Sequence, residues 1–283
     1  MYAKYFRTAL IAPTAALFMS MASVTHALPL VGAGFDLLQT QPGTSLDTAL
    51  LSTPLPLGII PLEGVPLESF DFGGTTGVQS TGNADTIIER KTDAEVPGAP
   101  NSTTIDIEIV ALQLKSVNPI DLSPLGPLPT DFIYITLQTQ RLPGEGSVVP
   151  APTPSTGQMT INFADDNGGT FDSFFDVFFD IRVGALDGNI IFSDDKRFET
   201  VGVEWDRLPE IGAILIDGIN HFLAGSGDPS GDFFPGPIVE LSPVDEENTI
   251  HNVKTATIPE PATSLLLLTG LLGMGAMRRR KTV

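Results

Sequence analysis

The stretch from Phe171 to Val183 limits the fold of this chain most, because an apolar side chain recurs at every second position from Phe175 to its end. Every second position holds an apolar side chain: Phe175, Val177, Phe179, Ile181 and Val183. The intervening positions mix charged and aromatic side chains: Asp172, Phe174, Asp176, Phe178, Asp180 and Arg182. A two-residue period is typical of a β-strand. We expect the first face to lie in a core and a neighbouring loop, such as the N-terminal segment, to cover the second.

Shorter segments repeat this period at residues 103–116, 132–139, 158–163, 198–205 and 250–258. In the first of these the apolar positions shift by one residue after Ile109, which predicts a β-bulge. Asp187-Gly188 predicts a hairpin turn into a short strand at 189–193. Long loops rich in Pro and Gly separate the strands. Together they predict a mainly β domain over residues 28–257, an antiparallel β-sandwich of the jelly-roll or immunoglobulin-like kind.

Two segments depart from the strand pattern. Residues 28–72 are dense in proline, which disfavours helices and central strands, so we expect an extended arm lying on the domain. Between Pro209 and Leu223 apolar residues recur at helical spacing, which predicts one short helix. Gly212 and Gly218 weaken that prediction, and a strand across residues 213–216 competes with it.

The first 27 residues have the features of a secretory signal peptide. Lys4 and Arg7 form a basic start, an apolar stretch follows, and small residues end the segment. We expect signal peptidase to cut after Ala27, with Ala22 as the alternative.

The domain between the terminal segments is strongly acidic. The whole chain has 15 basic and 34 acidic residues, and six of the basic residues and Glu260 belong to the terminal segments. This leaves a net charge of about −24, which repels phosphate backbones and disfavours nucleic-acid binding. Cations and neutral sugars are compatible partners. The chain has no cysteine, so it has neither disulfides nor thiolate metal sites.

The residues from 258 to 283 fall into three parts. Pro259, Glu260 and Pro261 come first, and the two prolines hold the backbone extended. An uncharged apolar run follows at 262–277, and as a transmembrane helix it would be about 24 Å long, shorter than the roughly 30 Å hydrocarbon core. A basic stop follows, which the positive-inside rule keeps in the cytoplasm: Arg278, Arg279, Arg280 and Lys281. We expect a temporary anchor.

This tail resembles the PEP-CTERM sorting signal, whose family members are exported by Gram-negative bacteria and processed at the membrane by an exosortase. The resemblance covers about a tenth of the chain and rests on the order and spacing of the three parts. It implies an exosortase-like partner, transient residence in the inner membrane through the C-terminal helix, and a final place at the outer surface or in the extracellular matrix. The family is associated with exopolysaccharide and biofilm material. An ordinary C-terminal anchor with a chance Pro-Glu-Pro is the alternative.

The best metal candidate is an acidic, glycine-rich segment, because Ca²⁺ prefers six to eight oxygen ligands on a flexible turn. Its candidate ligands are Asp165, Asp166, Asn167 and Asp172. The segment is not an EF-hand loop, since Gly169 stands where a ligand is needed and no distant Glu follows. Asp and Asn also form turns that bind no metal.

Catalytic motifs are absent from the sequence: it has no Gly-x-Ser-x-Gly, no His-Glu-x-x-His and no phosphate-binding or dinucleotide-binding glycine loop. His221 and His251 are the histidines outside the signal peptide, and we expect hydrogen-bonded structural roles for both. The sequence therefore predicts a non-enzymatic surface or matrix protein without a required cofactor. A secreted carbohydrate-binding module or glycan hydrolase on the same β-sandwich is the alternative.

Overall fold

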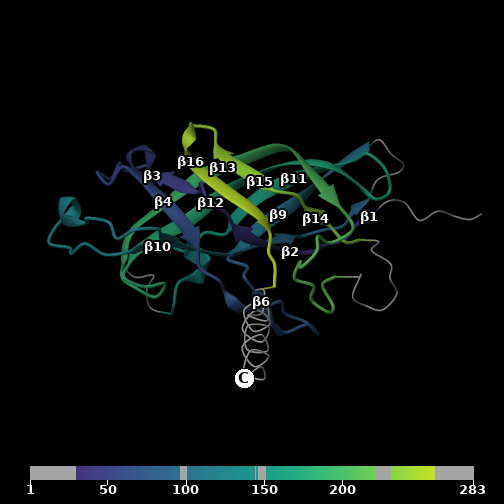
Figure 1. Cartoon of the computed structure of the whole chain (residues 1–283), viewed down its shortest axis with the longest axis horizontal. Coiled ribbons are helices and arrows are strands. Elements are labelled where there is room, and N and C mark those ends of the chain that lie inside the picture. Colours follow the sequence, from purple (N-terminus) through teal and green to yellow (C-terminus); the bar gives the residue numbers. More distant parts are fainter. Residues whose placement is uncertain (1–29, 96–100, 144, 146–150, 221–230, 259–283) are drawn as a thin grey trace, which may run out of the picture.

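The computed structural model describes residues 30–95, 101–143, 145, 151–220 and 231–258, and these residues form mainly antiparallel strands (Figure 1). The strands are β1 Leu30–Val31, β2 Gly34–Thr40, β3 Ser45–Asp47, β4 Ile59–Gly64, β5 Glu68–Asp71, β6 Val78–Gly82, β7 Thr86–Arg90, β8 Ala94–Glu95, β9 Asn101–Ser116, β10 Ile133–Leu137, β11 Ser155–Phe163, β12 Gly168–Val183, β13 Ile190–Asp206, β14 Phe234–Pro235, β15 Ile238–Ser242 and β16 Asp245–Thr255. Short 3-10 helices span Thr48–Leu50, Ser123–Leu125 and Gln138–Gln140. The expected mainly β, antiparallel fold is confirmed.

Twelve of the strands belong to one sheet whose pairing closes on itself. The long strand β9 pairs with β11 and β10 along one edge and with β7 and β4 along the other. From there the pairing continues through β12 and β13 on one side and through β2 and β3 on the other. The two sides meet because β15 joins β13 to β16, and β16 in turn pairs with β2 and β3. Two halves of the sheet therefore face each other.

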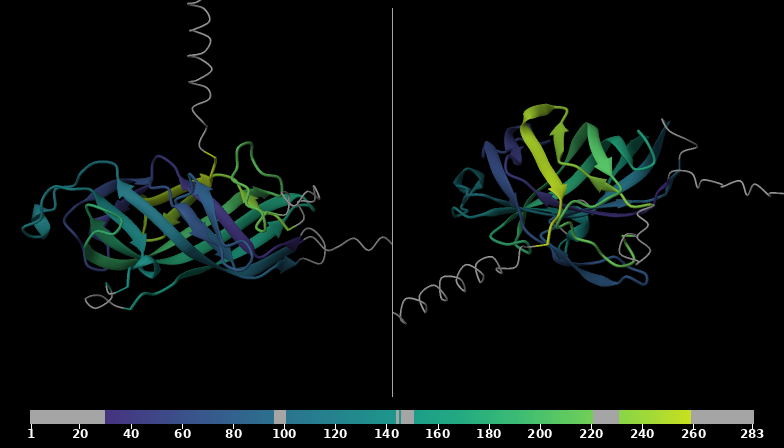
Figure 2. Two further views of the ribbon diagram at one scale, coloured as in Figure 1. Left: turned by 90° about the horizontal axis from the view of Figure 1, so that it is seen from below. Right: turned by 45° about the vertical axis from the view of Figure 1, so that its right-hand side comes forward.

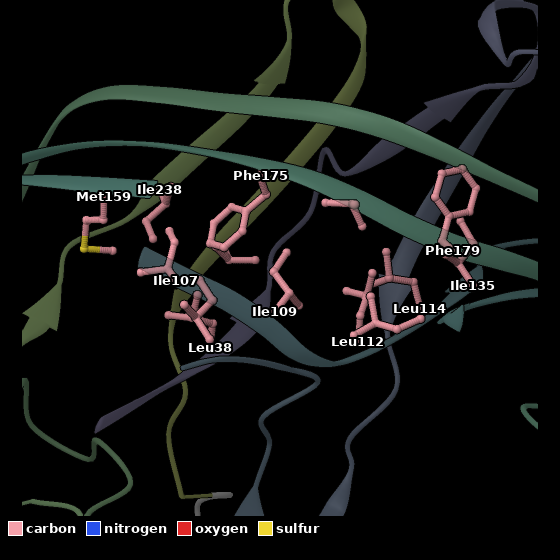
Figure 3. Close-up of a cluster of buried hydrophobic side chains, with 14 of the residues drawn as sticks. Leu38, Ile107, Ile109, Leu112, Leu114, Ile135, Met159, Phe175, Phe179 and Ile238 are labelled. Carbon is pink, nitrogen blue, oxygen red and sulfur yellow. The ribbon is translucent and has the colours of Figure 1, made fainter. Parts of the chain in front are cut away.

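The main core fills the space between these facing halves. Leu38, Ile107, Ile109, Phe175 and Ile238 come from four strands of both halves and point toward one another (Figure 3). The core face expected for β12 is confirmed, since Phe175, Val177, Phe179 and Ile181 are buried. Removal of this apolar surface from water, at about 25 cal/mol per Å², is the main source of stability in a chain without disulfides.

A second, smaller cluster lies on the outer face of β2, β7 and β9. Its buried members are Leu37, Phe72, Ala84, Ile87, Ala111, Ile214, Ile216 and Ala256. The β5–β6 hairpin and the segment 211–220 cover it, and Figure 2 shows both lying on one side of the main sheet. The chain needs this second layer because β9 carries Val110 and Ala111 on its outer face at the bulge, while Ile109 and Leu112 lie in the main core.

That bulge is where the sequence predicts it. Ile87 on β7 pairs with Ala111 and Ile88 pairs with Ile109, so Val110 is the extra residue on β9. The alternation of β9 changes phase there: Ile105, Ile107 and Ile109 lie in the main core, and Leu112 and Leu114 continue it.

The expectation of an N-terminal arm is wrong for the described part of residues 28–72. Residues 34–40 form β2, which is paired on both edges, with β16 and with β7. Pro42, Pro54, Pro56 and Pro66 lie between the strands, and Pro61 lies within β4, which pairs with β3 and β9. On the polar face of β12, Arg141 pairs with Asp180, Glu145 pairs with Arg182, and Arg197 lies over the Phe174 ring.

The expected short helix at Pro209–Leu223 is also wrong over its described residues. Gly212 and Gly218 have φ values of 88° and 83°, outside the helical region, and divide the segment into turns. Ala213 forms a bridge with Thr257 instead. In the same half of the chain, the strands expected at 189–193 and 198–205 are parts of one continuous strand, β13.

No helix among the described residues is long and apolar enough to cross a membrane. The helix predicted at 262–277 lies outside those residues, as does the signal peptide with Ala27.

Candidate sorting and binding sites

The point where the chain leaves the folded domain is held by backbone hydrogen bonds up to Ile258. Beyond the end of β16, Ala256 N–H donates to the carbonyl of Leu37 at 2.8 Å and Ile258 N–H donates to the carbonyl of Gly212 at 2.9 Å. Ile214 N–H donates to the carbonyl of Ala256 at 3.0 Å. Figure 1 shows this last part of the chain running from β16 down to β6. We name residues 256–258 the exit segment.

The exit segment is packed as well as hydrogen-bonded. Ala256 is fully buried in the second cluster, next to Ile214. Gly82 lies under the segment with a φ of 55°, and a Cβ there would come within 2.6 Å of Ile214 Cδ1 and 3.3 Å of the Thr257 carbonyl. Glycine is required at this position both by the backbone conformation and by the close approach. The folded domain therefore extends to the residue before Pro259.

The residues predicted to carry sorting begin there and lie outside the described residues: Pro259, Glu260, Pro261, Arg278, Arg279, Arg280 and Lys281. The structure places only what precedes them. No linker separates the last hydrogen bond of the domain, at Ile258, from the predicted motif.

The predicted calcium residues fall into two separate places. Asp165, Asp166 and Asn167 are exposed in the turn between β11 and β12, where Asp165 Oδ1 accepts the Asn167 N–H at 2.7 Å. Asp172 lies four residues beyond Gly168 on β12, about 13 Å along an extended strand. Its Oδ1 accepts the N–H of Gly202 on β13 at 2.7 Å.

Calcium ligands lie 2.3–2.6 Å from the ion, so this spacing argues against one ion held by all four side chains. Within the described ranges no group of three or more acidic or histidine side chains could hold a metal ion. Calcium binding at the turn stays a prediction.

The structure assembles a buried polar network around His251 that the sequence pattern did not reveal. His251 Nδ1 lies 2.7 Å from Glu240 Oε2, and Nε2 lies 3.4 Å from the hydroxyl of Thr40. The Thr40 hydroxyl donates to Asp85 Oδ1 at 2.7 Å. All four side chains are buried. The expected structural role of His251 is confirmed, since its ring is hydrogen-bonded inside the domain.

The residue types show which groups around Thr40 and Asp85 donate hydrogen bonds and which accept them. Asp85 accepts the Thr40 N–H and the hydroxyls of Thr40 and Thr86, all within 2.8 Å. The Thr40 hydroxyl gives its hydrogen to Asp85, so its oxygen faces His251 Nε2 as an acceptor, and His251 Nδ1 lies within hydrogen-bond distance of Glu240 Oε2. Burial raises the pKa of Asp85, and the hydrogen bonds from Thr40 and Thr86 oppose that rise.

An open groove lies between β13 and β15. The two strands pair at Glu199 and Leu241, and β13 next pairs at Trp205 with Pro235 of β14. Between these points the ladder opens into a groove of about 750 Å³. Val201 and Val239 line it with exposed side chains. Gly202, with a φ of 69°, allows β13 to bulge there.

The partners of His251 come from β2, β15 and the residue before β7, so no local motif could have identified them. The only sequence signal was a histidine at an inward position of a predicted strand. The groove had no signal either, because Val201 fits the alternation of a buried strand face yet is 80% exposed.

Comparison with known proteins identifies one region. Residues 257–281 match the family model of the PEP-CTERM protein-sorting motif, so the match begins inside the exit segment. No curated protein and no solved structure matches the chain. The motif indicates export and processing at the membrane by an exosortase. The chain is therefore a β domain that ends in a PEP-CTERM protein-sorting motif.

Proposed function

We propose that this protein is a non-enzymatic component of the cell surface or extracellular matrix, delivered there through its sorting motif. The observation that carries the proposal is the junction at Ile258, where a closed, hydrogen-bonded domain passes directly into the matched motif. Such a junction suits a protein whose folded domain is exported and whose C-terminal tail is the sorting signal.

The acidic surface and the buried histidine support a structural rather than catalytic role. His251, the described histidine, is committed to Glu240 and Thr40 inside the domain. A net charge of about −24 on the domain favours a hydrated, cation-rich surrounding such as an exopolysaccharide matrix. Exopolysaccharide is the proposed partner, the proposed final location is the outer surface of a Gram-negative cell, and the acidic charge disfavours nucleic acid as a partner.

Mass spectrometry of the protein recovered from cells tests the sorting pathway. We expect a mature N-terminus after Ala27 and a C-terminus that lacks Arg278 to Val283. A variant with Pro259, Glu260 and Pro261 all changed to Ala should keep the tail, while Pro237→Ala, a proline change in the β13–β15 groove, should not affect processing. Wild-type protein that reaches the surface with its basic end intact, in a host with an exosortase, would contradict the proposal.

A carbohydrate-binding module or glycan hydrolase is the second candidate, and the groove between β13 and β15 favours it. The groove is large enough for an extended ligand, and Glu199 and Glu204 lie along it. A glycan array distinguishes binding from the matrix role. Release of new reducing ends from polysaccharide, abolished by Glu199→Gln or Glu204→Gln, would establish a hydrolase.

A further inference from the structure

The exit segment lies beside exposed apolar side chains. Ile258 is 59% exposed although its N–H is bonded to Gly212, and the neighbouring Ile211 is fully exposed at 103%. Single exposed apolar residues are common on proteins. Here two isoleucines occupy adjacent segments at the point where the chain leaves the domain.

The β5–β6 hairpin extends this surface. Asn83 N–H reaches the Thr257 carbonyl at 3.4 Å, and a Cβ on Gly218 would come within 2.7 Å of the Thr76 hydroxyl. Val78, at the start of β6, is 65% exposed. Figure 1 shows β6 beside the end of the described chain. We name Val78, Ile211 and Ile258 the exit face.

The length of chain after Ile258 limits how far this face can lie from a membrane. Only Pro259, Glu260 and Pro261 separate Ile258 from Ala262, where the apolar run begins. Four residue steps span at most about 14 Å when fully extended. The headgroup layer on one side of a bilayer takes up about 5–7 Å. With the apolar run in the hydrocarbon, less than about 9 Å remains between the headgroups and Ile258, less than the width of one helix.

We propose that, before processing, the domain docks on the bilayer surface through the exit face, with Ile211, Ile258 and Val78 in the headgroup layer. This inference rests on the proposed function, because it requires the tail to be inserted. Apolar side chains that bind at an interface enter about 5–10 Å below the headgroup boundary, a depth within reach here.

The charge of the exit face determines which lipid headgroups it can approach. The segments that form the exit face, residues 68–82, 209–220 and 256–258, contain no Lys or Arg. They contain exposed acidic residues, including Asp71, Glu210 and Asp217. Anionic headgroups would repel this face within a Debye length of about 8–10 Å. The partner is therefore a zwitterionic lipid surface.

The chain is suited to a labelling experiment because it has no cysteine. Full-length protein without its signal peptide is reconstituted into phosphatidylcholine vesicles containing a headgroup-level quencher. Single variants Ile211→Cys and Val78→Cys carry an environment-sensitive fluorophore. Val244→Cys is the matched control, because Val244 is 75% exposed and lies at the far end of β16, about 35 Å from the exit. Leu266→Cys, in the apolar run, reports tail insertion.

We expect strong quenching at positions 266, 211 and 78 and several-fold weaker quenching at 244. Adding Ile211→Asp to the Val78→Cys variant should reduce the quenching of the label at position 78, and replacing half of the lipid by phosphatidylglycerol should do the same. Quenching at 266 with equal, weak quenching at 211, 78 and 244 would overturn docking while leaving tail insertion intact. Absence of quenching at 266 would overturn both docking and the membrane stage of the proposed function.

Discussion

His251 Nδ1 lies 2.7 Å from Glu240 Oε2 across the β15–β16 pair, and both side chains point into the core. His251→Ala would leave the Glu240 carboxylate buried without its partner. We expect a loss of about 1–3 kcal/mol in the free energy of unfolding, the range for leaving a buried acceptor without its hydrogen bond. Urea denaturation of residues 28–258 measures it.

Lys254→Ala is the control, because Lys254 points outward from the same strand and should change stability by less than about 0.5 kcal/mol. A loss as small as the control's for His251→Ala would show that the pair is not coupled to folding.

The buried ion pair between Arg141 and Asp180 should contribute more to the free energy of unfolding than an exposed ion pair does. Two guanidinium nitrogens of Arg141 lie 2.6 Å from the two oxygens of Asp180, which has no exposed surface. Arg141→Ala should cost about 3–5 kcal/mol. Arg197, which pairs with Asp176 and Glu199 on the surface, should cost about 1 kcal/mol or less when changed to Ala. Equal denaturation midpoints for the two variants would contradict this assignment.

The pairing of Glu145 with Arg182 should account for part of the stability that the protein loses at low pH. Its hydrogen bond with Arg182 lowers the pKa of Glu145 from 4.5 to about 2. The unfolded chain binds this proton first as the pH falls, so the contribution of Glu145 is complete above about pH 4.5 and is lost as the pH falls toward 2. Denaturation midpoints between pH 5 and 2 should therefore fall less steeply for Glu145→Gln than for wild type. Solvent screening makes the difference modest, and identical slopes would exclude the contribution.

Calcium provides a test of the acidic turn. We expect any thermal stabilisation by Ca²⁺ to disappear in the double variant Asp165→Ala, Asp166→Ala, whose two carboxylates lie in the turn, and to be much smaller with Mg²⁺, which demands tighter octahedral geometry. At about 100 times Kd, Ca²⁺ would add about 2.7 kcal/mol. A wild-type melting temperature that is the same in chelator and in millimolar Ca²⁺ would leave the segment as a turn only.

The sequence by itself determined the strands with a strict two-residue period. β9, its bulge at Val110, β10, β11 and β12 follow from local alternation, because each residue's face is set by its position in the strand. The sorting motif was also readable, since its recognition depends on consecutive residues and their order.

Several other features depend on contacts between residues that are far apart in the sequence. Within the proline-rich residues 34–64, the strands β2, β3 and β4 form because β16, β7 and β9 provide pairing edges, which no local propensity records. The segment 209–220 has helical spacing, yet positive φ at Gly212 and Gly218 and the contact with Thr257 shape it otherwise. The buried polar network joins side chains from distant strands: Glu240, His251, Thr40 and Asp85. The backbone N–H of Ile258 is likewise bonded to a distant residue, through the carbonyl of Gly212. Such contacts arise from long-range packing, which overrides local preference wherever it buries more surface or satisfies more hydrogen bonds.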